Sequence, residues 1–143
     1  MFIIVVPGQI PKVWENIKYA ISQTGDINEE DFPLYANRLL HALLSGRAQC
    51  IVRMDDDRNL LAIGITRIII DNVTGKDIMF LECFYSFARV PTSEWKDLYT
   101  LALKIAKKEK CTKMSAYTSN PRVFEILINL GFTEYYRYFT MEI

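Results

Sequence analysis

Apolar residues recur along the chain at two spacings, and each spacing predicts a different kind of element. A helical face three and four residues apart runs from Ile10 to Ile21 and again through 92–110. A further helix is predicted over 30–45, where the buried face is supplied by Leu39, Leu40, Leu43 and Leu44. Shorter apolar runs bounded by polar turns predict strands at 2–6, 49–54, 60–70, 78–87, 113–118 and 133–142.

Residues at the expected ends of the helices support this division. Asn120 is suited to cap a helix over 121–130, with Pro121 at its first position and Gly131 just past its end. Thr92 or Ser93 is expected to cap the helix over 92–110. The predicted order is β-α-α-β-β-β-α-β-α-β, an α/β (α+β) fold with a mixed central sheet.

Composition indicates one globular domain covering 1–143. Half of the residues are hydrophobic, and 17 basic side chains balance 17 acidic ones. Because the net charge is zero, no overall field attracts nucleic acid or a membrane surface. The apolar run at residues 2–6 stops at Pro7 and is too short for a signal peptide or a membrane span.

Cysteine and histidine usage argues against disulfides and metal sites. The three cysteines have no C-x-x-C spacing, and Cys50 and Cys83 lie within apolar strands, which predicts a reduced, cytoplasmic protein. His41 is the single histidine and lies in a leucine-rich helix, so we expect no metal site.

One motif and the order of elements together resemble the Gcn5-related N-acetyltransferase (GNAT) superfamily. The motif covers 120–132: an Asn opens a helix that ends in Gly131-Phe132 before the last strand. The resemblance covers nearly the whole chain. It implies a GNAT-like sheet and acetyl-CoA as cofactor. It also implies cofactor contacts from the strand backbone at Phe84, Tyr85 and Phe87, and from Arg89 and Asn120.

The chain departs from the family at two places. The loop at 88–95 contains no glycine, although family members hold the cofactor diphosphate there on glycine N–H groups. Pro91 lacks an N–H, Glu94 would add negative charge, and a Thr92 or Ser93 cap would compete for the same donors. Leu127 stands where many members carry a general-acid tyrosine. The tyrosines that could replace it are Tyr117, Tyr135, Tyr136 and Tyr138.

Glu82 is the candidate catalytic residue, at a place where some relatives carry a general base for the substrate amine. Its neighbours in sequence are apolar, and a carboxylate in apolar surroundings would hold a proton more tightly, which suits a general base. The alternative is that Glu82 points to solvent or pairs with a Lys or Arg.

Two functions follow from the resemblance. The first is transfer of an acetyl group from acetyl-CoA to a primary amine of a small molecule or protein, with weak or lost activity. The second is a non-catalytic GNAT-like binding or assembly module, similar to degenerate bacteriophage-encoded proteins and then virion-associated. The aromatic-rich end, residues 132–139, could form an interface for a homo-oligomer or a protein partner.

Overall fold

A mixed sheet of five strands runs through the centre of the computed structural model, which describes residues 1–25 and 27–143. The strands are β1 (Phe2–Val5), β2 (Ala48–Met54), β3 (Leu60–Ile70), β4 (Asp77–Ser86) and β5 (Met114–Ala116). Their order in the sheet follows the chain. β1 to β4 are antiparallel neighbours, and only β4 and β5 pair in parallel. Short polar turns allow the antiparallel pairs, whereas the parallel pair needs a helical crossover.

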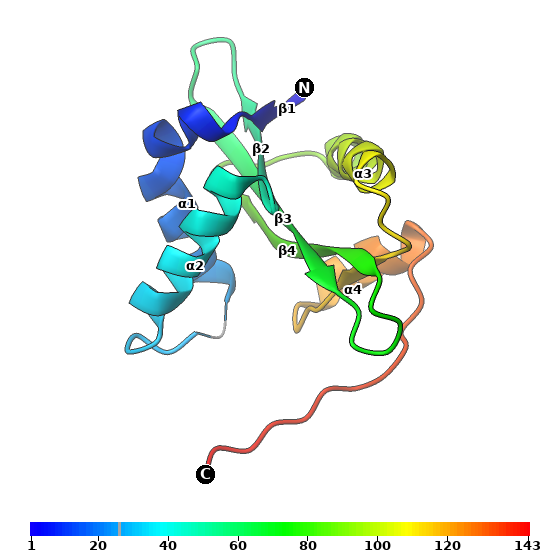
Figure 1. Cartoon of the computed structure of the whole chain (residues 1–143). Helices are drawn as coiled ribbons and strands as arrows, with labels where there is room; N and C mark the ends of the chain where they lie inside the picture. Colours follow the sequence, from blue (N-terminus) through cyan, green and yellow to red (C-terminus); the bar gives the residue numbers. More distant parts are fainter. Residues whose placement is uncertain (26) are drawn as a thin grey trace.

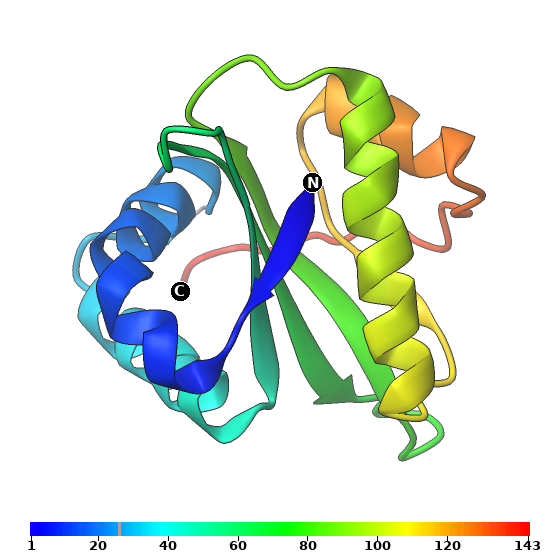
Figure 2. The same cartoon turned by 90° about the horizontal axis from the view of Figure 1, so that it is seen from above.

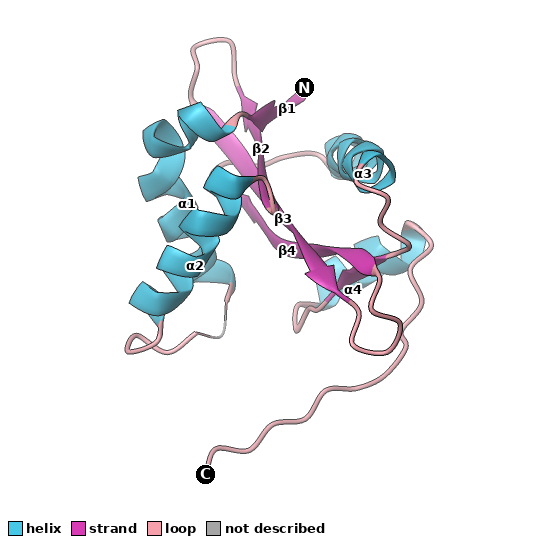
Figure 3. Cartoon of the chain, viewed as in Figure 1, coloured by secondary structure: helices cyan, strands magenta, loops and turns pink. Residues whose placement is uncertain are grey.

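Helices cover both faces of the sheet (Figures 1 and 2). They are α1 (Ile10–Thr24), which follows the short 3₁₀ turn η1 (Pro7–Gln9), then α2 (Phe32–Ser45), α3 (Thr92–Lys108) and α4 (Pro121–Asn129). α1 and α2 lie on one face and α3 and α4 on the other, as the colouring by element in Figure 3 makes clear. None of the described helices combines the length and the apolar character needed to cross a bilayer.

Each face of the sheet has its own hydrophobic core. Ile17, Ile21, Leu39 and Leu43 of α1 and α2 are buried against β2 and β3. Leu98 and Ala102 of α3 and Leu127 of α4 are buried on the opposite face. The predicted helical faces are therefore the buried ones, except that Leu44 is 48% exposed.

The predicted ends of α4 are confirmed. The Asn120 side chain accepts a hydrogen bond from the Arg122 N–H at 3.0 Å, and Pro121 occupies the first turn. Gly131 has φ +98°, in the left-handed region that a glycine adopts without steric cost. This geometry returns the chain toward α3, where the Phe132 ring lies 6.1 Å from the Tyr99 ring.

The final strand predicted over 133–142 is wrong. These residues are extended but pair with no strand, and they leave the domain toward the α1 and α2 side (Figures 1 and 2). Alternating apolar residues describe only the faces of a strand, whereas a strand also needs a neighbour for its backbone groups. β5, which ends the sheet beyond β4, is three residues long and shorter than the predicted 113–118.

Candidate functional site

Glu82 is the extra residue of a β-bulge in β4. Ile65 of β3 pairs with Cys83 and the next residue, Thr66, pairs with Leu81, so Glu82 has no partner of its own. A bulge turns the following side chains to the other face of the sheet. Met79 and Leu81 accordingly pack with α3, whereas Cys83 packs with α1 and α2.

β4 and β5 separate just before this bulge. Their pairing covers only Met79–Leu81 and Met114–Ala116, although β4 continues to Ser86. The Phe87 N–H bonds the Leu61 carbonyl of β3 at 2.8 Å. Because peptide groups alternate in direction along a strand, those of Phe84 and Ser86 face away from β3, toward the unpaired edge. This edge can hydrogen-bond an extended ligand that carries amide groups.

Of the predicted cofactor-contact residues, Phe84 directs its peptide group toward this edge, whereas those of Tyr85 and Phe87 face β3. Their side chains also lie on opposite faces of the sheet. The Phe84 ring packs 6.1 Å from Trp95 of α3. Tyr85 and Phe87, 5.0 Å apart, pack instead around Tyr19 of α1. The three residues form no common side-chain pocket.

The N-terminus of α3 is not capped as expected. Pro91 is the N-cap residue and makes no side-chain cap bond, while Thr92 and Ser93 lie inside the first turn. Proline holds the chain extended immediately before the helix, so Thr92 becomes the first helical residue instead of the cap. The predicted competition from a Thr92 or Ser93 cap is therefore wrong. Arg89 is exposed in the loop just before this helix end.

Glu94 forms a salt bridge with Arg53 of β2, so the negative charge of Glu94 is already paired. Arg53 donates from Nε to Oε2 and from Nη2 to Oε1, the second at 2.7 Å. These hydrogen bonds lower the pKa of Glu94. The expected repulsion between Glu94 and a diphosphate is therefore largely offset by the Arg53 guanidinium.

The Glu82 carboxylate lies in polar surroundings rather than the apolar ones that its sequence neighbours suggest. Arg67 of β3 donates from Nε to Oε2 at 3.0 Å, and its Nη2 lies 2.9 Å from Oε1. The Tyr35 hydroxyl of α2 donates to Oε1 at 2.8 Å. The Glu82 side chain is only 9% exposed, so this pairing compensates its charge. The alternative prediction, an ion pair, describes the observed contacts.

Tyr35 and Arg67 are the functional candidates that sequence reasoning missed. They precede Glu82 by 47 and 15 residues, and no motif links them to it. The Arg67 guanidinium also lies 6.0 Å from the centre of the Tyr35 ring. Burial and the charge of Glu82 raise the pKa of Tyr35 well above its usual value, so its hydroxyl stays a donor.

Leu127 lies in the core, whereas Tyr117 lies next to the place where β4 and β5 separate. Leu127 is buried in the core between α4 and the sheet, and no tyrosine occupies its place. Tyr117 follows the last residue of β5, 67% exposed, with its ring 5.1 Å from Phe80 of β4. A hydrogen bond with Tyr136 raises the pKa of Tyr117.

Asn120, predicted to touch the cofactor, uses its side-chain oxygen to cap α4.

Among the described residues, no group of three or more His, Cys, Asp and Glu side chains is placed to hold a metal ion. All three cysteines are free thiols. Burial raises the pKa of Cys50 to about 12 and that of Cys83 to about 11. Neither buried thiol is therefore activated as a nucleophile.

No family model and no curated protein matches the chain. Solved structures do. A predicted acetyltransferase with acetyl-CoA from Clostridium acetobutylicum has a TM-score of 0.73 at 12% identity, covering 99% of this chain and 95% of that one. A ribosomal-protein-alanine N-acetyltransferase from Brucella melitensis has a TM-score of 0.69 at 12% identity, covering 100% and 99%. The aminoglycoside N-acetyltransferase AAC(6')-Iy in complex with a bisubstrate analog has a TM-score of 0.70 at 16% identity. The match covers 100% of this chain and 97% of that one. These likenesses establish the acetyltransferase fold, as the order of elements predicted.

Proposed function

We propose that the chain is an N-acyltransferase of the GNAT type that moves an acetyl group from acetyl-CoA to a primary amine. The observation that carries this proposal is the unpaired edge of β4. It begins at the Glu82 bulge and leads to the uncapped N-terminus of α3. The three solved structures named above are acetyltransferases by description, and two of them contain acetyl-CoA or a CoA-derived analog.

The residues present fit the cofactor in part. The peptide groups of Phe84 and Ser86 would bind the pantetheine amides in the manner of an added strand. The N–H groups of Thr92 and Ser93 at the start of α3, with Arg89 beside them, would hold the diphosphate. Phe87 and Ala88 contribute no free N–H, since both bond the Leu61 carbonyl. We therefore expect this loop to bind the diphosphate more weakly than a glycine-rich loop does.

When bound, acetyl-CoA supplies an activated thioester carbonyl, and the protein contributes position and proton transfer. Glu82 would accept the proton of the amine, directly or through one water. Arg67 and Tyr35 hold this carboxylate in place by hydrogen bonds, which makes it a well-oriented base. Tyr117, whose phenolic hydroxyl is a hydrogen-bond donor, would donate a proton toward the departing thiolate. Its raised pKa makes it a weak acid. We expect slow transfer.

Thermal unfolding with and without excess acetyl-CoA tests cofactor binding. A ligand at about a hundred times its Kd stabilises the folded state by about 2.7 kcal/mol, which gives a visible rise in Tm. The catalytic role is tested with Glu82→Gln. This variant should keep the acetyl-CoA shift and lose acetylation of a panel of primary amines. Glu109→Gln, at the far end of α3, is the matched control and should keep both. A wild-type protein whose Tm does not respond to acetyl-CoA would contradict the proposal.

A second candidate function is a non-catalytic GNAT-like binding module. The observations that favour it are the loop N–H groups occupied by Leu61 and the buried Leu127 in place of a tyrosine. The resemblance to bacteriophage-encoded, virion-associated proteins belongs to this candidate. An absent acetyl-CoA shift combined with a co-purifying protein partner would support it over the enzyme.

A further inference from the structure

Three aromatic rings meet where α1 packs on the end of β4. The Tyr19 ring lies 5.8 Å from Tyr85 and 6.1 Å from Phe87, and the Tyr85 and Phe87 rings lie 5.0 Å apart. We call these three residues the aromatic cluster. The Tyr19 and Phe87 rings are inclined to each other by only 25°, whereas Tyr85 stands at 79° and 82° to them. The cluster therefore has two nearly parallel rings and a third ring across them.

The aromatic cluster is open to solvent, although it joins a helix to the sheet. Tyr19 is 50% exposed and Phe87 is 37% exposed, whereas the neighbouring Cys83 is buried under α1. A hydrogen bond with Tyr19 raises the pKa of Tyr85, so the two phenols also hold each other in place. The face of an aromatic ring carries partial negative charge and attracts a cation within about 6 Å of the ring centre. The exposed cluster is therefore suited to an ammonium group.

Negative charge borders the approach to Glu82 on the same face of the sheet. Three exposed acidic residues, here called the acidic loop, precede α2: Glu29, Glu30 and Asp31. They lie about one helical turn before Tyr35, whose hydroxyl donates to Glu82. Within the described residues, none of the three is paired with a Lys or Arg. Lys18, beside Tyr19, has its charge paired with Glu15 at 2.9 Å. This surface therefore attracts cations.

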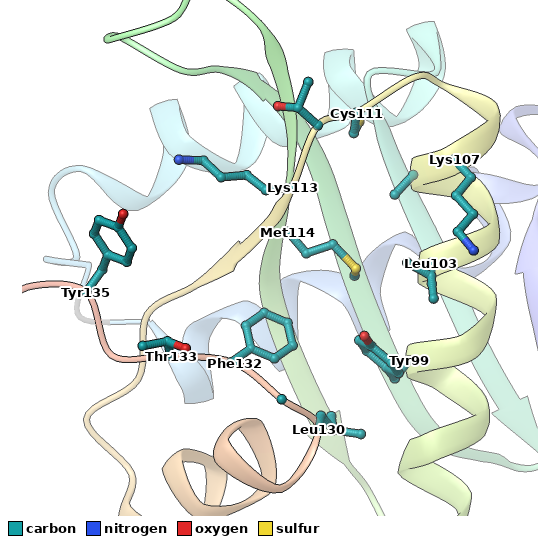
Figure 4. Close-up of a pocket in the computed structure, with 13 residues that line it drawn as sticks. Tyr99, Leu103, Lys107, Cys111, Lys113, Met114, Leu130, Phe132, Thr133 and Tyr135 are labelled. Carbon is teal, nitrogen blue, oxygen red and sulfur yellow. The ribbon is translucent and has the colours of Figure 1, made fainter.

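The hollow on the other face of the sheet has different chemistry. A groove of about 480 Å³ lies there between α3 and β5. Figure 4 shows Tyr99 and Phe132 beside it together with Lys107 and Lys113. The two lysines disfavour a cation in that groove. Of these two surfaces, the one at α1 and α2 is the one that combines exposed rings with unpaired carboxylates.

We propose that the acceptor is a linear polyamine, with one terminal amine at Glu82 and another ammonium group on the aromatic cluster. Tyr85 and Phe87 follow Glu82 by three and five residues of extended chain, so they lie about 10–17 Å from it. At about 1.2 Å per bond, the terminal nitrogens of an extended molecule are about 11 Å apart in spermidine, about 16 Å in spermine and about 6 Å in putrescine. The longer polyamines span this distance, and putrescine does not.

The role of Glu82 in this inference rests on the proposed acetyl transfer, whereas the binding of the polyamine does not. The reacting nitrogen, as the neutral amine, forms the N–C bond while the C–S bond of acetyl-CoA breaks. Its proton passes to Glu82, and the departing thiolate takes a proton from Tyr117. The distal ammonium group stays charged on the aromatic cluster and sets which terminal amine reaches Glu82.

Calorimetric titration of the full chain with spermine and with putrescine, both without acetyl-CoA, tests the cation site. Spermine should bind about 10-fold more tightly, because only spermine reaches the aromatic cluster from Glu82. Tyr19→Leu keeps apolar bulk but removes the ring face, and it should raise the Kd of spermine about 5-fold. Tyr19→Phe keeps the ring and should bind as the wild type does. Equal Kd values for spermine and putrescine, or for Tyr19→Leu and the wild type, overturn the proposal.

A pair of double variants tests the acidic loop. Glu29→Gln with Glu30→Gln should raise the Kd of spermine about 3-fold at low salt, and added salt should reduce this difference. Asp56→Asn with Asp57→Asn is the matched control, because it removes two charges from the exposed turn between β2 and β3. It should leave the Kd unchanged. Equal effects of the two double variants would mean that only net charge matters, which contradicts a site beside α2.

Acetyl-CoA binding and spermine binding are measured separately, so the two proposals can fail separately. A chain that binds spermine through Tyr19 but shows no acetyl-CoA shift in Tm loses the proposed function and keeps the cation site. A chain that acetylates simple amines but binds spermine no better than putrescine loses the cation site alone. In the acetylation assay, Tyr19→Leu should raise the KM for spermine and leave kcat and the KM for acetyl-CoA unchanged, a split that a general loss of folding would not give.

Discussion

The chemistry of Glu82 depends on side chains that lie far from it in sequence. The β-bulge turns the carboxylate toward α2, where the Tyr35 hydroxyl meets it, and Arg67 reaches it from the neighbouring strand. The sequence around a single aspartate or glutamate in an apolar strand does not determine the surroundings of its carboxylate. Those surroundings are set by the side chains of other elements that pack against it. The contacts with Arg67 and Tyr35 decide that the Glu82 carboxylate is held in one position.

Removing Arg67 should expose the energetic role of this pair. Arg67→Met leaves the Glu82 carboxylate 9% exposed without its cation, which should lower the free energy of unfolding by about 3 kcal/mol. The value lies at the low end for buried pairs because the Arg67 side chain is 21% exposed. Urea denaturation at neutral pH measures the loss. Adding Glu82→Gln to the variant should recover part of it, and simple additivity of the two substitutions would argue against the pair.

Helix α3 packs on the sheet over Gly64 of β3, a position that leaves no room for a side chain. A Cβ added to Gly64 of β3 would lie 2.6 Å from Leu98 Cδ1, and Leu98 is 1% exposed. Glu94, in the first turn of the same helix, pairs with Arg53 of β2. The first contact sets the distance of α3 from the sheet, and the second anchors its N-terminal end.

Gly64→Ala should overpack the interface between β3 and α3. Forcing one methyl group into a closed core typically costs about 1–3 kcal/mol. Thermal unfolding should show a lower Tm for this variant. Gly8→Ala is the matched control, because a Cβ at Gly8 has no atom within 4 Å. An unchanged Tm for Gly64→Ala would mean that α3 can move away from the sheet without cost.

The pairing of Glu94 and Arg53 should make stability depend on pH in the acid range. The pKa of Glu94 is lowered in the folded state, so its contribution is present above the pKa of an unfolded glutamate. That contribution is lost as pH falls through the lower, folded pKa. The stability difference between wild type and Glu94→Gln should therefore be largest near neutral pH and vanish in acid. Denaturation curves over this range measure it; a constant difference would contradict the pair.

At the scale of the whole molecule, the two cores protect the thiols unequally. Cys50 and Cys83 are buried between the sheet and the helices α1 and α2, whereas Cys111 follows α3 and is only half-buried. Burial also raises the pKa of Cys50 to about 12 and that of Cys83 to about 11, which suppresses the reactive thiolate.

Labelling with a thiol reagent at mildly alkaline pH should therefore be biphasic. One thiol should react quickly, and two should react only as fast as the domain opens. Cys111→Ser should abolish the fast phase and leave the slow one. Rapid labelling of all three cysteines would contradict the packing of α1 and α2 on the sheet.

The sequence by itself determined the elements whose signals are local. Helical spacing in α1 and α3, the polar turns of the meander and the cap at Asn120 depend on neighbours a few residues away, so periodicity and turn chemistry were enough. Tertiary structure decided the rest: the bulge at Glu82, its pairing with Arg67 and Tyr35, and the pairing of Glu94 with Arg53. It also decided that residues 133–143 form no strand of the sheet. Each of these depends on which groups from distant segments meet, and pairing along the backbone leaves no periodic trace in the residues that pair.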